Sequence, residues 1–205
     1  MHNQLTTETL KRCLHIMAHK MEICFDELNA LDNQVGDGDI GVTMATGFKE
    51  ILIIINELPD NLSESLTKCA QAFTKTCGAS FGTLFATGLL AAAKEIKGEK
   101  ELVWSRIPDM LSVSIEQMAQ RGRSKLGDKT MLDGLSSIQK AISGIEDPDE
   151  MLKAANNATL KVLEDFKNKP CKQGRARIFA DKTIGLDDPG MLVIRRLIEG
   201  LNEAK

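Results

Sequence analysis

The chain has 205 residues, with 26 basic and 29 acidic side chains, so its formal net charge is −3 and its pI is about 5.7. This length fits one large domain or two small ones, and the small negative charge gives no reason to expect bulk binding to nucleic acid or to an anionic membrane. We interpret residues 1–205 as a single domain. The polar N-terminus lacks the features of a signal peptide, and the longest strongly apolar run, Ile51 to Ile55, is too short to span a bilayer, so we expect a cytoplasmic protein without membrane contact.

The first predicted element is a long amphipathic helix from Leu5 to Leu31, where apolar residues recur every three or four positions. His15 and His19 lie four residues apart on this helix, close enough to chelate a metal. They flank the apolar stripe and lack a third ligand, so we favour a purely structural interpretation of both.

The segment that follows, from Leu31 to Gly41, holds three aspartates and three glycines between two strongly apolar stretches. Like charges this close repel one another unless a cation lies between them, and short carboxylates on a glycine-rich backbone suit one hard ion. Asp32, Asp37 and Asp39, spaced Asp-x4-Asp-x-Asp, are therefore predicted to bind Mg²⁺. The alternative is a polar turn between helices in which the aspartates cap backbone amides.

Two other motifs fit this segment poorly. Its glycines form G-x-G-x-x-G, but a helix rather than a strand is predicted before them, and Asp37 and Asp39 would face a pyrophosphate directly. Mg²⁺ placed between the aspartates and the phosphates of a nucleotide removes this conflict. An EF-hand is excluded, because the sixth and twelfth positions counted from Asp37 are Val and Phe rather than Gly and Glu.

Seven more helices are predicted from apolar periodicity and from start and stop signals such as Asp147-Pro148 and Lys169-Pro170. They cover residues 42–58, 63–76, 84–93, 102–120, 131–142, 148–166 and 191–201. With the first helix this makes eight, and no convincing alternating strand is present. The predicted fold class is therefore all-α.

Three further segments between these helices are unusual. Residues 77–83 are small enough to bring backbone N–H groups close to a ligand, although close helix packing explains them equally well, and no Lys follows Gly82 as a Walker A loop requires. Residues 121–130 form a basic, Gly-punctuated loop, either solvated or in contact with a nucleotide or an acidic partner. Residues 174–190 are the longest irregular stretch, and loops of this length are often functional.

These three segments and the aspartate segment are expected to meet. Consecutive antiparallel helices place alternate connections at the same end of a bundle, and the four segments follow the first, third, fifth and seventh helices. The topology therefore predicts one composite site.

The five cysteines are odd in number and contain no C-x-x-C pair. Most of them lie at apolar positions of the expected helices, which is typical of reduced cysteines in a core. We expect neither a disulfide nor a zinc site among Cys13, Cys24, Cys69, Cys77 and Cys171.

Four separated motifs carry a resemblance to a known family. They are Leu31-Asp32…Gly36-Asp37-Gly38-Asp39, Gly127-Asp128-Lys129-Thr130-Met131-Leu132-Asp133, Gly174-Arg175-Ala176 and Ile184-Gly185…Asp188-Pro189-Gly190. In this order they are highly specific, and over nearly its whole length the chain resembles the DAK2 (DhaL-like) family of dihydroxyacetone kinase L subunits. The resemblance implies an antiparallel eight-helix barrel that binds ADP or ATP at one end through two Mg²⁺ ions.

The resemblance also assigns roles to residues. Asp32, Asp37 and Asp39 would hold the metal ions and, with Arg175, act in catalysis. The nucleotide would be lined by residues of all four segments: Ile40, Gly41, Val42, Thr43, Ser80, Phe81, Gly122, Met131, Arg175, Asp188, Pro189 and Gly190. Arg175 suits a phosphate or the charge that develops in phosphoryl transfer, and Met131 suits packing against adenine.

The chain departs from the family pattern near the expected phosphates. The family's small-residue loop commonly reads Gly-Gly-Ser/Ala-Ser-Gly-Pro, whereas Ala79, Phe81 and Thr83 replace its second Gly, second Ser and Pro here. Ile40 takes a place often held by His or Thr. The ring of Phe81 would narrow the pocket or stack against a neighbour, while the aspartate triad is intact.

The implied function is phosphoryl transfer, which needs positioning and charge neutralisation more than covalent chemistry. The family's L subunit transfers a phosphoryl group from Mg-bound nucleotide to dihydroxyacetone or a related ketose on a separate K subunit, and an M subunit of the phosphotransferase system recharges the bound ADP. Two alternatives are an ATP-dependent ketose kinase subunit and a nucleotide-state sensor that binds a transcription regulator. The nucleotide domain of a fatty acid kinase is disfavoured, because that architecture carries a further C-terminal domain. A homodimer is compatible with each interpretation.

Overall fold

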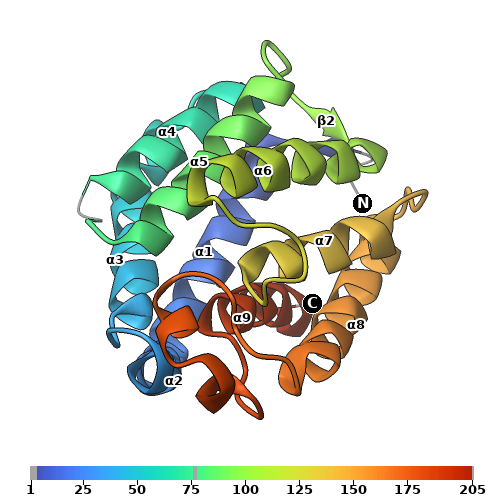
Figure 1. The fold of residues 1–205 in the computed structure, drawn as a ribbon. Coiled ribbons are helices and arrows are strands. Elements are labelled where there is room, and N and C mark those ends of the chain that lie inside the picture. The colour runs from blue at the N-terminus through green and yellow to red at the C-terminus, as the bar shows by residue number, and fades with distance from the viewer. Residues whose placement is uncertain (1–3, 76–77, 205) are drawn as a thin grey trace.

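The computed structural model describes residues 4–75 and 78–204, and in that part of the chain nine α-helices dominate (Figure 1). The helices are α1 (Thr7–Ile23), α2 (Phe25–Val35), α3 (Ile40–Ile53), α4 (Leu62–Thr74), α5 (Ser80–Glu95), α6 (Ile107–Gly122), α7 (Met131–Ile142), α8 (Pro148–Lys167) and α9 (Pro189–Glu203). The strands β1 (Gln4–Leu5) and β2 (Leu102–Val103) form one short antiparallel pair. The predicted all-α class is confirmed.

Eight of these helices pack in a closed ring. α1 packs against α3, each helix from α3 onward packs against the next one along the chain, and α9 returns to α1. The short helix α2 lies beside this ring, against α3 and α9 (Figure 1). Apolar residues of all eight ring helices meet in one continuous core, as the period of three to four residues in each helix requires. The predicted eight-helix barrel is therefore confirmed.

An aromatic cluster fills the core between α3, α4 and α5. The ring centroid of Phe73 lies 5.9 Å from that of Phe48 and 4.9 Å from that of Phe85. Both Phe48 and Phe73 are fully buried. Gly47 of α3 faces Phe73 so closely that a Cβ atom there would lie 2.5 Å from the ring. The cluster thus holds α3 and α4 in close contact beside the end of the ring where α3 begins.

The predicted long helix from Leu5 to Leu31 is wrong in one respect, because the chain forms two helices that meet at Cys24. The ψ angle of Cys24 is 6°, outside the helical range, so α2 leaves the direction of α1. Met21, Cys24 and Leu28 are all buried, so the apolar period continues across the break and gives no sign of it.

Two other boundaries differ from the prediction. α5 begins at Ser80 rather than Leu84, so residues 80–83 form the first turn of a helix instead of a loop. α6 begins at Ile107 rather than Leu102, because Leu102 and Val103 pair with β1. A pair of two-residue strands is too short to produce an alternating pattern.

Among the described residues, the thiols of Cys13, Cys24, Cys69 and Cys171 are free, and burial raises the pKa of each. Cys77 lies outside the described residues. None of the helices in this part of the chain has the length and apolar character needed to cross a bilayer.

Candidate functional site

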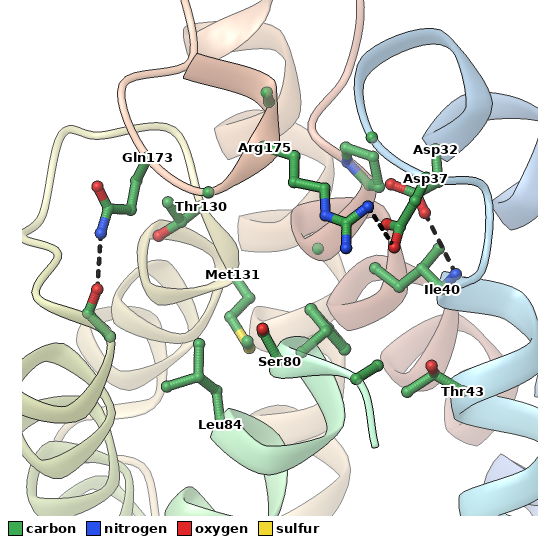
Figure 2. A pocket seen from close by; sticks show the side chains of 18 of the residues that line it. Asp32, Asp37, Ile40, Thr43, Ser80, Leu84, Thr130, Met131, Gln173 and Arg175 are labelled. Carbon is green, nitrogen blue, oxygen red and sulfur yellow. Dashed lines mark hydrogen bonds and ion pairs between the residues drawn. The ribbon is translucent and has the colours of Figure 1, made fainter. Parts of the chain in front are cut away.

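A cavity of about 1110 Å³ opens at one end of the ring (Figure 2). The first residues of α3, α5, α7 and α9 line it, as do the last residues of α2 and α6. The start of a helix carries the positive end of the helix dipole, so four helices favour an anion in this cavity. α5 adds to this effect, since its N-cap Ala79 provides no side-chain cap.

The aspartate segment forms the wall of the cavity between α2 and α3. Asp32, Asp37 and Asp39 each bring a carboxylate oxygen to within 4.8 Å of the other two. Asp32 is 8% exposed, whereas Asp37 and Asp39 are partly exposed to the cavity. Three hard oxygen donors this close together suit Mg²⁺, which is usually held by a few carboxylates together with ligand oxygens.

The backbone of this segment is shaped by Asp32. Its Oδ2 accepts hydrogen bonds from the N–H groups of Asp39 (2.9 Å) and Ile40 (3.3 Å). A Cβ atom at Gly36 would collide with the same carboxylate, and Gly38 has a φ of +77°, which favours glycine. Asp32 thus does cap α3, as the alternative interpretation held, but Asp39 at the N-cap position makes no capping hydrogen bond with its side chain.

The electrostatics of the segment favour a cation. Burial raises the pKa of Asp32, the hydrogen bonds from Asp39 and Ile40 oppose this rise, and the nearby charge of Asp37 adds to it. A protein that buries one carboxylate beside another incurs a cost that a divalent cation removes. The three aspartates therefore fit a magnesium site in both donor type and charge.

Arg175 approaches the aspartates from the opposite side of the cavity. It lies on a short 3-10 helix, Arg175–Ile178, and its Nη1 atom is 2.7 Å from Oδ2 of Asp37 (Figure 2). The side chain of Arg175 is 66% exposed, so this ion pair contributes little to stability. Its guanidinium group is available to a phosphate at the same place.

The other end of the cavity is apolar. Leu84 of α5 and Met131 of α7 lie away from the aspartates (Figure 2), and Met118 of α6 also lines the cavity. Gly122 lies beside Leu84, and a Cβ atom there would approach Cδ2 of Leu84 to 3.3 Å. A polar end for phosphates and an apolar end for a flat base together match the shape of a nucleotide.

The cavity brings together all four segments that the sequence singled out. Of the residues predicted to line the nucleotide, all but Gly41 line the cavity wall. Gly41 instead donates its N–H to Oδ1 of Asn29 at 2.8 Å, and a Cβ atom there would collide with the backbone of Phe25. It packs against α2 behind the cavity.

Phe81 occupies the gap between the starts of α5 and α9. Its ring packs against the core, and a Cβ atom at Gly190 would lie 3.0 Å from Cε2 of the ring. The same position would lie 3.1 Å from Oδ1 of Asp188 and 3.4 Å from Cβ of Met131, so the start of α9 is closely packed here. Phe81 thus contacts the start of α9 and also lines the cavity.

Sequence reasoning missed several residues of the wall. Leu84 and Met118 follow the apolar period of their helices and look like ordinary core residues. Gln173 donates from Nε2 to the carbonyl oxygens of Gly122 (2.6 Å) and Arg123 (3.1 Å), which closes the rim (Figure 2). Only its position in the sequence, directly before Gly174-Arg175, could have indicated that Gln173 lies at the site.

Thr130 is another missed residue, and it begins α7 at the cavity. Its side chain accepts the N–H of Leu132 at 3.2 Å, while Asp133 accepts the N–H of Thr130 at 2.9 Å. This reciprocal pair is a capping box, and Thr-x-x-Asp before an apolar run is its sequence signal. This signal indicates where the helix starts, but it does not indicate that Thr130 lines a cavity.

Comparison with known proteins gives one family and a consistent fold. The model of the DAK2 domain matches residues 34–203. The chain is 27% identical over 191 residues to "PEP-dependent dihydroxyacetone kinase 2, ADP-binding subunit DhaL" of Listeria innocua, covering 87% of this chain and 88% of that one. It is 29% identical over 185 residues to "Triokinase/FMN cyclase" of Bos taurus, covering 87% of this chain but 32% of that protein.

A solved structure has the same fold. The dihydroxyacetone kinase of C. freundii, crystallised with AMP-PNP and Mg²⁺, superimposes with a TM-score of 0.75 at 24% identity. The match covers 95% of this chain and 33% of that one. The chain thus spans about a third of the length of the triokinase and of this kinase, and most of the length of the Listeria subunit.

Proposed function

The chain belongs to the DAK2 domain family, and on this premise we propose that it is the nucleotide-binding subunit of a kinase for dihydroxyacetone or a related ketose. It would transfer a phosphoryl group from a nucleotide in the cavity to a ketose held on a K subunit. The observation that carries the proposal is the meeting of three aspartates, Arg175 and the starts of four helices around one cavity. The names of the relatives, which include ADP-binding and kinase subunits, support it.

The cavity suggests how a nucleotide would lie. Its base would pack between Leu84, Met118 and Met131, and its phosphates would point toward Asp37 and Arg175. The start of α5, whose N-cap Ala79 provides no side-chain cap, would then face the phosphates, which need donors rather than further carboxylates. We propose that Ile40, Val42, Thr43, Ser80, Phe81, Gly122, Asp188, Pro189 and Gly190 complete the wall around it.

Asp32, Asp37 and Asp39 would hold two Mg²⁺ ions, which supply charge neutralisation for the phosphates when bound. Asp32 is pre-oriented for this task by the two N–H groups that it accepts. Arg175 would stabilise the charge that develops on the transferred phosphoryl group. Each of these roles requires positioning and electrostatics rather than a covalent nucleophile on this chain.

We propose further that the bound nucleotide acts as a coenzyme and is recharged in the cavity by a phospho-His of an M subunit. Relatives named PEP-dependent dihydroxyacetone kinase support this donor. To test it, the chain is mixed with its K partner and dihydroxyacetone, and is then supplied either with ATP or with phosphoenolpyruvate and the phosphotransferase proteins. Many turnovers per subunit with ATP alone would exclude the coenzyme role and favour an ATP-dependent kinase subunit.

The nucleotide site itself is tested by calorimetric titration of ADP with and without Mg²⁺. We expect binding that depends on Mg²⁺ and that Asp37→Asn reduces by about a hundredfold or more, because removing one carboxylate breaks the metal site. Asp26→Asn is the matched control, since Asp26 is an exposed aspartate of α2 outside the cavity. Undiminished affinity of Asp37→Asn for ADP would refute the site.

A further inference from the structure

Lys129 is a buried cation that the proposed chemistry does not use. Its side chain is 1% exposed, although it comes from the basic loop between α6 and α7. Its Nζ atom donates to four backbone carbonyl oxygens, those of Lys167 (3.4 Å), Lys169 (2.8 Å), Thr183 (3.1 Å) and Leu186 (2.8 Å). An ammonium group has three N–H donors, so all are used and one is shared.

The four carbonyls belong to the two ends of one excursion of the chain. Residues 168–187, which we name the Arg175 segment, leave the last residue of α8 and return to the N-cap of α9. Lys167 is the residue just before this segment and Lys169 lies at its start, whereas Thr183 and Leu186 lie near its end. The single ammonium group of Lys129 therefore joins both ends of the segment that carries Arg175.

Other hydrogen bonds reinforce the same junction. Gly185 donates its N–H to the carbonyl oxygen of Lys167 at 2.8 Å, and Cys171 donates its N–H to Oγ1 of Thr183 at 2.8 Å. Lys172 donates its N–H to the carbonyl oxygen of Asp128, the residue before Lys129, at 2.9 Å. The segment is thus tied to itself and to the loop that delivers the ammonium group.

The loop around Lys129 is built to deliver its side chain inward. Lys129 has a φ of +63°, a left-handed conformation that costs energy for a residue other than glycine. Asp128 accepts the N–H of Lys125 at 2.9 Å, and Asp133 accepts the N–H groups of Gly127 (2.6 Å) and Thr130 (2.9 Å). These bonds hold the strained turn and account for most of the motif Gly127-Asp128-Lys129-Thr130-Met131-Leu132-Asp133.

The energetics of this arrangement favour a positioning role. Burial lowers the pKa of the Lys129 amine, and negative charges around it, that of Asp188 among them, oppose this effect. The carbonyl at the end of α8 lies at the negative end of a helix dipole, where a cation is favourable. Without the ammonium group, the partly buried carbonyl oxygens of Lys169 and Leu186, one at each end of the segment, would lose this donor, which is costly.

We propose that Lys129 is a positioning residue: its ammonium group fastens both ends of the Arg175 segment and thereby sets Arg175 against Asp37 at the phosphate end of the cavity. Only the last step, from Arg175 to a bound nucleotide, rests on the function proposed above. The fastening itself is a property of the free chain and is tested without a ligand.

The first test is amide hydrogen exchange of the full chain, read by mass spectrometry for peptides within residues 168–187. Lys129→Met keeps the length of the side chain and removes the charge, and we expect exchange in these peptides to accelerate on the order of tenfold or more while α1 and α4 stay protected. Lys125→Met is the matched control, because Lys125 is an exposed cation of the same loop. Unchanged exchange of the segment in Lys129→Met would overturn the proposal.

The second test is a double-mutant cycle on the affinity for ADP with Mg²⁺. We expect Lys129→Met to weaken binding about tenfold in the wild-type background but less than about twofold in the Arg175→Ala background, because both changes remove the same contribution. If the losses in binding free energy from the two substitutions were fully additive, the link from Lys129 to Arg175 would be overturned. If the wild-type chain does not bind ADP, the proposed function fails, and the exchange experiment still decides whether Lys129 fastens the segment.

If Lys129→Met does not fold, a milder substitution tests the same proposal. Lys129→Gln keeps two N–H donors for the four carbonyls, so it retains part of the network. We expect a folded protein with faster exchange confined to residues 168–187. Protection equal to that of the wild type in this variant would count against the proposal, since a neutral amide would then serve as well as the ammonium group.

Discussion

Nη1 of Arg175 lies 2.7 Å from Oδ2 of Asp37, so the segment before α9 touches the segment before α3 across the mouth of the cavity. The side chain of Arg175 is 66% exposed and that of Asp37 is 35% exposed. Water weakens an ion pair in such a position, and the pair is easily exchanged for stronger partners. A cation at Asp37 and a phosphate at Arg175 would provide those partners together.

The first prediction concerns this arginine. Arg175→Ala is expected to weaken the affinity for ADP with Mg²⁺ about tenfold and to slow phosphoryl transfer to the ketose about a hundredfold or more, since charge in the transition state loses its donor. Arg175→Lys keeps the charge but loses the fork of two N–H groups, so we expect affinity to recover further than rate. Calorimetry and an assay with the K partner measure the two quantities.

The control for this arginine comes from its own segment. Lys182 is an exposed cation near Arg175 that does not belong to the cavity wall. Lys182→Ala removes the same charge from the segment, and both quantities should stay within about twofold of the wild type because surface charges act weakly at a distance. Equal losses in Lys182→Ala and Arg175→Ala would mean that general charge, rather than contact, explains the effect.

The helices of this fold were predictable where their ends carry their own signals. α7 begins at Met131 as predicted, because Thr130 and Asp133 form a capping box, and α8 begins at Pro148 after the N-cap Asp147. The break at Cys24 was not predictable, because the apolar period runs through it and neither Gly nor Pro marks it. Tertiary packing against α3 and α9 decides the direction of α2 there.

The candidate site was predictable as a meeting of segments but not in its details. Alternation of antiparallel helices is enough to place Asp37, Ser80 and Arg175 at one end. It does not say that Gly41 faces Asn29, nor that Lys129 of a basic, glycine-rich loop is fully buried. Each of those facts depends on which other part of the chain packs against that backbone. The apolar pattern of one sequence does not give that part's position.

The second prediction compares two glycines inside helices. A Cβ atom at Gly47 would lie 2.5 Å from the ring of Phe73, which is fully buried in the aromatic cluster. Gly47→Ala is therefore expected to lower the free energy of unfolding by about 1–3 kcal/mol through overpacking. Urea denaturation of the two proteins measures the difference.

Gly134 of α7 provides the contrast. A Cβ atom there would lie 3.4 Å from the side chain of Ile194, an ordinary contact distance. Because Ala favours a helix over Gly by about 1 kcal/mol, Gly134→Ala should leave stability unchanged or raise it by up to that amount. A loss of stability in Gly134→Ala as large as that in Gly47→Ala would show that the aromatic cluster is not the cause.

The third prediction concerns the pH dependence of stability and Asp188, the N-cap of α9. Burial raises the pKa of its carboxyl group from 3.8 to about 7, while the hydrogen bond from Met191 and the charge of Lys129 oppose the rise. The folded chain therefore binds this proton more tightly than the unfolded chain. The resulting stabilisation is complete below about pH 4 and is lost as the pH rises through about 7.

Asp188→Asn separates this titration from the cap, because the amide oxygen of Asn still accepts the N–H of Met191. Without nucleotide or Mg²⁺, the variant should be more stable than the wild type, with a gain that grows by on the order of 2 kcal/mol between pH 5 and pH 8. Asp147→Asn makes the same change at the exposed N-cap of α8 and corrects for losing a carboxylate from a helix start. The pH profiles of stability are measured by urea denaturation. Parallel profiles for the wild type and Asp188→Asn would show that Asp188 is ionised in the folded chain. The wall of the cavity would then carry a negative charge where a phosphate is proposed to lie.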